Sequence, residues 1–267
     1  KKHKVHLYSK EKINKNKDMP FILKDSLGYI LSIYGSRLIS YIFRIIIARI
    51  LGPGDFGLWS TLALILLYGN LLDLGLNYAL AKEVPFYRGK ELLQEVNEVR
   101  NTAFTWVIII ATISSFVILA SALFFIKYGN NLPIIISLIA LILVLQQIKN
   151  YVVSYFVAEK NFKAISVMII AIPALIGTFT LTLVGRLHLI GLPMGIALGY
   201  FLVLFYIFNK YKFILKPQIN IKRFFSLVKI GFPIMMIVIA FTLFFTVDRI
   251  LIFKYLGKEN VGYYGIA

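Results

Sequence analysis

The sequence predicts an all-α membrane protein with several transmembrane helices. Of its 267 residues, 59% are hydrophobic and only 15% are charged, and the mean hydropathy is +0.81. Soluble domains are about 45–50% apolar, so a chain of this composition could not hide its apolar surface behind a polar exterior. The apolar residues lie in runs of about 20, long enough to cross a hydrocarbon core as helices. A porin-type barrel would instead show short alternating segments.

Seven of these runs are expected to span the membrane, and an eighth begins near Gly262. The expected spans cover about residues 28–50, 57–81, 102–126, 132–157, 164–185, 188–209 and 225–253. Every second connector is basic, whereas the connectors between them are short and carry little charge. Because Lys and Arg collect in cytoplasmic loops, this alternation predicts a multi-pass protein of a prokaryotic cell membrane with a cytoplasmic N-terminus.

Charge and composition also narrow the function. The net charge of +17 is explained by the cytoplasmic connectors, so we do not expect nucleic-acid binding. The chain has no cysteine, and its three histidines show no metal-ligand spacing. We find no catalytic triad, carboxylate pair or phosphate-binding glycine loop. The sequence therefore predicts a transporter rather than an enzyme, with no metal and no cofactor.

Two cytoplasmic segments have their own composition. Residues 1–27 are rich in lysine and are expected to form a basic tail that ends in a short interfacial helix. Residues 82–101 mix acidic and basic side chains with one apolar stripe, formed by Leu92, Leu93, Val96 and Val99. That pattern predicts an amphipathic helix lying along the inner membrane surface between the second and third spans.

A repeat relates two distant parts of the chain. Residues 44–59 (RIIIARILGPGDFGLW) return as residues 249–264 (RILIFKYLGKENVGYY), at a constant offset of 205 residues without a gap. Arg44 matches Arg249, Gly52 matches Gly257 and Gly57 matches Gly262. Internal repeats of this kind are typical of transporters.

The repeat sets the expected domain organisation. Six spans separate the two copies, so both run outward and the repeat is parallel. We expect a basic tail at 1–27, a six-helix lobe at 28–209, a cytoplasmic linker at 210–224 and the start of a second lobe at 225–267. The chain begins with Lys1 rather than Met and stops inside an apolar segment. It therefore reads as part of a 12–14-helix transporter whose substrate path lies between two lobes.

Polar residues inside the spans are the candidate binding residues, because an ionisable group at membrane depth costs about 2.5–3.5 kcal/mol on insertion scales. Arg37 and Arg44 lie seven residues apart on nearly one face of the first span. They could line a cationic cavity. Alternatively, Arg44 extends to the outer headgroups and Arg37 bonds a neighbouring carbonyl or carboxylate.

Three other spans add further candidates. The second span carries one polar stripe, formed by Asn70, Asp73 and Asn77. The fourth carries another, formed by Gln146, Lys149 and Asn150, with Gln147 off the stripe. The seventh carries Arg249 beside Asp248 near its outer end, where Arg249 either joins the cavity or forms an interfacial salt bridge with Asp248. We expect Asp73 to pair with Arg37 or to bind a cation, and Lys149 either lines the cavity or extends to the inner surface. The net charge of these candidate residues is positive, which favours an anionic solute such as phosphate or diphosphate.

The motifs resemble those of a known family. Residues 48–60 (ARILGPGDFGLWS) and 72–80 (LDLGLNYAL) are similar to the opening of polysaccharide-export flippases of the multidrug/oligosaccharidyl-lipid/polysaccharide exporter superfamily. Residues 231–233 (GFP), 247–250 (VDRI), 256–257 (LG) and 262–264 (GYY) are similar to the start of their second lobe.

The resemblance implies two six-helix lobes and alternating access. It also implies flipping of polyprenyl-diphosphate-linked oligosaccharides across the cytoplasmic membrane. Its implied partners are membrane lipids and the lipid-linked glycan, with polymerases and glycosyltransferases of polysaccharide synthesis as further candidates. Two other functions stay open on the sequence: a cation-coupled multidrug exporter, which would favour acidic cavity residues, and a non-transporting scaffold of a polysaccharide-synthesis complex.

Overall fold

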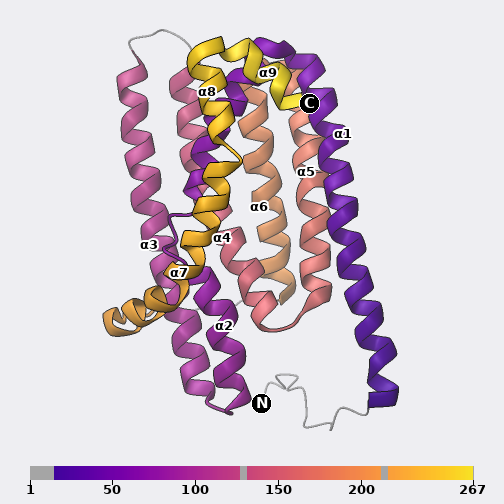
Figure 1. The fold of residues 1–267 in the computed structure, drawn as a ribbon, viewed down its shortest axis with the longest axis vertical. Helices are drawn as coiled ribbons and strands as arrows, with labels where there is room; N and C mark the ends of the chain where they lie inside the picture. The colour runs from indigo at the N-terminus through magenta and orange to yellow at the C-terminus, as the bar shows by residue number, and fades with distance from the viewer. Residues whose placement is uncertain (1–14, 127–130, 212–215, 267) are drawn as a thin grey trace.

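The computed structural model describes residues 15–126, 131–211 and 216–266, and all of its regular elements are helices (Figure 1). The helices are α1 (Lys15–Gly69), α2 (Leu76–Gly89), α3 (Leu93–Phe125), α4 (Leu132–Ala158), α5 (Phe162–Leu187), the 3-10 turn η2 (His188–Ile190), α6 (Gly191–Tyr211), α7 (Ile221–Phe244), α8 (Val247–Leu256) and α9 (Lys258–Ile266). Of the expected basic tail, residues 1–14 lie outside the described residues, and α1 begins within the remainder.

The described chain is built to cross a membrane several times. Five stretches are long and apolar enough to do so: Leu27–Gly69, Leu93–Phe125, Leu132–Ala158, Phe162–Tyr211 and Ile221–Leu256. The first is divided at Gly52, and the fourth is divided at η2. The five stretches therefore contain six of the seven apolar runs that the sequence predicts and the first part of the second run, and the prediction of a multi-pass helical membrane protein is confirmed.

The second predicted span is wrong as a continuous helix. The structure has a turn between α1 and α2, with Leu74 at a φ of 54° and Gly75 at 80°. The Asp73 carboxylate accepts the backbone N–H groups of Gly75 at 3.1 Å and Asn77 at 3.2 Å. Asp73 thereby satisfies donors at the start of α2 that a continuous helix would have bonded to carbonyls, and the chain can break there.

The amphipathic interfacial helix predicted at 82–101 is also wrong. Its first part is the end of α2, a turn follows with Glu91 at a φ of 60°, and its last part is the start of α3. Val96 and Val99 are buried in a core cluster with residues of α2 and α4. Half of the apolar stripe that suggested contact with the membrane surface therefore packs inside the protein, whereas Leu92 and Leu93 are exposed.

The seventh predicted span is divided into α7 and α8. The break lies at Phe245 and Thr246, where the Thr246 hydroxyl forms a hydrogen bond of 2.6 Å with the Tyr68 hydroxyl of α1. At the other end of α7, the Asn220 side chain caps the helix by accepting the N–H of Arg223 at 3.0 Å. The helix begins at Ile221, so it takes up the end of the predicted 210–224 linker.

The two copies of the repeat have the same backbone conformation and pack against one another. Gly52 has φ and ψ of 73° and 170°, and Gly257 has 84° and 175°. This region of backbone space is essentially restricted to glycine, which explains why both copies carry one there. Figure 1 shows the C-terminal helices α8 and α9 beside the upper part of α1. The contact holds the second copy directly on the first.

The packed interior consists of two clusters of buried apolar side chains. One joins α2, α3, α4, α5, α6 and the start of α7, with Tyr151 and Met168 fully buried. The other joins α1, α4, α5 and α6, with Ile139 and Leu143 fully buried. The cavity described next lies among α1, α4, α5 and α6, between parts of these two clusters.

Candidate functional site

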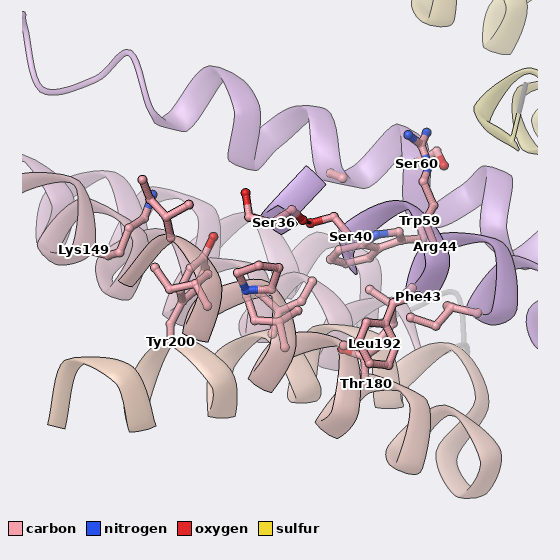
Figure 2. Close-up of a pocket in the computed structure, with 18 of the residues that line it drawn as sticks. Ser36, Ser40, Phe43, Arg44, Trp59, Ser60, Lys149, Thr180, Leu192 and Tyr200 are labelled. Atoms are coloured by element: carbon pink, nitrogen blue, oxygen red, sulfur yellow. Dashed lines mark hydrogen bonds between the residues drawn. The ribbon is translucent and has the colours of Figure 1, made fainter. Parts of the chain in front are cut away.

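A cavity with a volume of about 710 Å³ is lined by α1, α4, α5 and α6, with one residue from α8. Three of its lining residues are basic: Arg44, Lys149 and Arg249. In Figure 2, Lys149 and Tyr200 lie at one end, Arg44, Trp59 and Ser60 lie at the other, and Ser36 and Ser40 lie between them. None of the described residues that line it is acidic.

The outer end of the cavity contains both arginines of the repeat. Arg44 and Arg249 occupy equivalent repeat positions, and each influences the other electrostatically. Neither forms an ion pair with a described carboxylate, and the Arg249 Nε is buried without a hydrogen-bond partner. Asp248 lies beside Arg249 in the chain and interacts with it electrostatically, but it does not line the cavity. The two guanidinium groups that line the cavity have the chemistry to bind an anion.

The other end of the cavity contains Lys149. Its ammonium group donates to the Asn150 Oδ1 and lies 5.8 Å from the centre of the Tyr200 ring. The Asn150 Nδ2 in turn donates to the Asn70 Oδ1 at 2.8 Å. Three predicted site residues are thus brought together here, with Lys149 in the cavity wall and the two asparagines behind it.

Most of the neutral cavity wall was missed by sequence reasoning, although Ser40 lies between Arg37 and Arg44 on the helix face that the sequence marks. The wall presents hydroxyl and aromatic groups from Ser36, Ser40, Trp59, Thr180 and Tyr200. The Ser36 and Ser40 hydroxyls donate to carbonyls of their own helix, each at 2.8 Å. Single hydroxyls in otherwise apolar helices carry no periodic signal. Pro173 and Gly177, which the sequence marks only as kink positions, also line the cavity.

Arg37 lies beside the main cavity rather than in it. With Ser36, Ser40, Tyr41 and Arg44 it lines a smaller pocket of about 230 Å³, and its side chain is exposed. The ion pair predicted between Arg37 and Asp73 is not among the ion pairs of the described residues, because the Asp73 carboxylate is directed to the backbone of α2.

The remaining predicted site residues are buried away from the cavity. Asp73 and Asn77 form the start of α2, and Gln146 faces the interior, where its Oε1 has no hydrogen-bond partner. Gln147, which the sequence set aside, donates to the Gly69 carbonyl at 2.6 Å and so helps to end α1. Of the polar residues in the second and fourth spans, Asn70, Asn150 and Gln147 therefore join α4 to the break between α1 and α2.

The chemistry available in the cavity is anion binding. Within the described ranges, no group of three or more His, Cys, Asp or Glu side chains is placed to hold a metal ion. The basic residues instead offer guanidinium and ammonium donors, and the wall adds neutral hydroxyl groups and aromatic rings. This combination suits a solute with a phosphate group and polar, ring-shaped neighbours.

Comparison with known proteins identifies the family. No curated protein and no solved structure gives a significant match. A family model described as polysaccharide biosynthesis protein matches residues 22–267, which is nearly the whole chain. The match includes both copies of the repeat and every basic residue of the cavity. The chain therefore belongs to the polysaccharide biosynthesis protein family, as the resemblance of its motifs predicted.

Proposed function

We propose that this protein moves a lipid-diphosphate-linked oligosaccharide across the cytoplasmic membrane. The main support is that Arg44 and Arg249 line one cavity, which has no acidic lining residue among the described residues. A diphosphate carries the charge that two guanidinium groups can bind through paired hydrogen bonds. The membership in a polysaccharide biosynthesis family supplies the class of the attached group, a glycan.

The cavity does not favour a cation-coupled exporter. Such a transporter would need a carboxylate in the path, and neither carboxylate of the predicted spans lines the cavity. Asp73 accepts backbone N–H groups of α2, and Asp248 accepts the Tyr264 hydroxyl and the Arg249 N–H. No observation favours the scaffold alternative either, because a scaffold has no need for unneutralised charges in a cavity of this size. Buried charges without partners are costly and are characteristic of transport pathways.

The repeat supports transport by alternating access. Its two copies run in the same direction and meet at the end of the cavity that holds Arg44 and Arg249. In parallel-repeat transporters, the site lies between two related lobes that rock against each other. We propose that residues 28–209 form the first lobe and that residues 225–267 begin the second. Each lobe then contributes one of the two arginines to the site.

The test is the paired change Arg44→Ala and Arg249→Ala in the full chain. The protein is reconstituted in vesicles with a polyprenyl-diphosphate oligosaccharide, and flipping is followed by the fraction that external periodate oxidises. We expect the initial rate to fall at least about tenfold, since each arginine supplies charge-assisted hydrogen bonds to the diphosphate.

The repeat also provides a matched control. Arg49 and Lys254 are the equivalent pair five positions further along each copy, and neither lines the cavity. Changing both to alanine removes the same charge, and we expect the rate to stay within about twofold of the original protein. The proposed function would be overturned if both double variants lost flipping rate equally, or if the Arg44/Arg249 variant lost none.

A further inference from the structure

The basic residues of the cavity lie at two separate places, and one diphosphate can occupy only one of them. The lining residues run along α6 from Tyr200, whose ring centre lies 5.8 Å from the Lys149 ammonium, to Leu192, which lies near Arg44 in Figure 2. This length of helix is about 12 Å at 1.5 Å per residue. A diphosphate is two phosphates joined through one oxygen and is far shorter. The Arg44/Arg249 end and the Lys149 end are therefore distinct anion positions.

The Lys149 ammonium is held in the cavity wall although a charge without an opposite partner is energetically unfavourable there. Among the described residues its ammonium pairs with no carboxylate, and it donates a hydrogen bond to the neutral Asn150 side chain. The Asn70–Asn150 hydrogen bond fixes that acceptor to the end of α1, so Lys149 cannot simply swing to the membrane surface without losing its partner. A cation retained under these conditions is available to an anion that enters the cavity.

We propose that Lys149 binds an anionic group on the transported glycan itself, a carboxylate or a phosphate ester within reach of the diphosphate. This inference rests on the proposed function, because it assigns the diphosphate to Arg44 and Arg249. The neutral wall between the two positions, to which Ser36 and Ser40 contribute, then accommodates the intervening sugar. Lys149 is thus a specificity-determining residue that selects acidic glycans.

The experiment measures a ratio of flipping rates. Three polyprenyl-diphosphate disaccharides are compared that differ only in the terminal sugar: a neutral hexose, the corresponding uronic acid, and the hexose with a phosphate monoester. The vesicles contain only zwitterionic phosphatidylcholine. The original protein is expected to flip at least one acidic substrate faster than the neutral one, and the preferred acid distinguishes a carboxylate from a phosphate ester.

Variants then test whether Lys149 causes the preference for acidic substrates. Lys149→Met keeps the length of the side chain and should lower the acidic-to-neutral ratio at least about tenfold, as expected for one charge-assisted hydrogen bond. Lys149→Arg should keep the ratio. Lys160→Met, which removes a lysine beyond the end of α4 that does not line the cavity, is the control for loss of one charge. Arg44→Ala with Arg249→Ala should lower the rates of all three substrates and leave the ratio unchanged.

The outcomes separate this inference from the proposed function. If Lys149→Met lowers all rates equally, Lys149 contacts the diphosphate and the inference is overturned while the function stands. If the arginine variants leave every rate unchanged, the function itself fails. If the original protein shows no acidic preference, or loses it when phosphatidylglycerol is added, the second position is not for a glycan anion.

Discussion

Gly57 and Gly262 are equivalent positions of the repeat, and each lies against the backbone of the other copy. A Cβ atom on Gly57 would lie 1.8 Å from the carbonyl oxygen of Lys258, and one on Gly262 would lie 2.1 Å from that of Pro53. Pro53 and Lys258 are themselves equivalent. The contact is therefore reciprocal, as in an interface related by a twofold axis. It joins α1 to α9 at the end of the cavity where Arg44 and Arg249 meet.

The first prediction concerns this contact. Gly57→Ala and Gly262→Ala each place a methyl group where a carbonyl oxygen already lies, so α1 and α9 must separate. We expect each variant to lose about 1–3 kcal/mol of unfolding free energy, the usual cost of overpacking a close contact. The measurement is thermal unfolding of the detergent-solubilised protein.

Gly54→Ala is the matched control for the glycine contact. It lies in the same turn, but the nearest atom to its added Cβ would be 3.9 Å away, which is ordinary packing. We expect its stability to change by less than about 0.5 kcal/mol. A drop in Gly54→Ala as large as that in Gly57→Ala would mean that the loss arises from the local turn rather than from contact with α9.

A second close contact joins the other two motifs that carry the family resemblance. A Cβ on Gly231 of α7 would lie 1.9 Å from the carbonyl oxygen of Gly75, and Gly75 is held at a φ of 80° beside the turn formed by Asp73. The motifs at 72–80 and 231–233 are thus two sides of one contact between α2 and α7. A role in a transport site is not needed to explain Asp73, because its carboxylate builds this turn.

The second prediction follows for Asp73. Asp73→Ala removes the acceptor for the Gly75 and Asn77 N–H groups and should cost about 1–2 kcal/mol of stability, as the loss of a helix cap does. Asp73→Asn keeps one acceptor oxygen and should recover at least half of that loss. Thermal unfolding measures both. Equal destabilisation by the two variants would show instead that the negative charge matters, which would return Asp73 to a role in binding.

The sequence predicts the helical spans well and the breaks within them poorly. Apolar runs and the alternation of basic connectors identify the membrane helices, because both signals extend over many residues. The break at Asn70–Gly75 depends on one carboxylate that turns back to two N–H groups, a local competition that hydropathy does not register. The stripe of Val96 and Val99 was misassigned for a related reason: periodicity shows an apolar face but not whether lipid or protein covers it.

The candidate site was predicted in part, because the repeat marks two of its residues in the sequence. Arg44 and Arg249 could be paired from the sequence because they occupy the same place in two copies of one motif, and both line the cavity. Arg37, Asn77 and Gln146 were selected only as polar residues within apolar spans, and the structure places them outside the main cavity. Thr180 and Tyr200 could not be found, because which face of α5 and α6 meets α1 is decided by packing.

The third prediction concerns the pair behind Lys149. Asn70, the first residue after α1, and Asn150 of α4 share a hydrogen bond of 2.8 Å. The bond links the cavity wall at Lys149 to the break between α1 and α2. Asn150→Ala leaves the Asn70 side chain partly buried without its donor and removes the acceptor of the Lys149 ammonium. Each single variant, Asn70→Ala or Asn150→Ala, should therefore lose about 1–3 kcal/mol of unfolding free energy, the cost of an unsatisfied buried polar group.

The double variant decides whether the two residues act as a unit. Once either partner is gone, removing the other costs little more, so the loss in Asn70→Ala with Asn150→Ala should fall short of the sum of the single losses by about 1 kcal/mol. Gln147→Ala, whose side chain bonds the Gly69 carbonyl rather than Asn70, serves as the uncoupled partner for Asn150→Ala. Strict additivity of Asn70 and Asn150 would show that the hydrogen bond does not hold Lys149 in place, and its ammonium would then be free to leave the cavity wall.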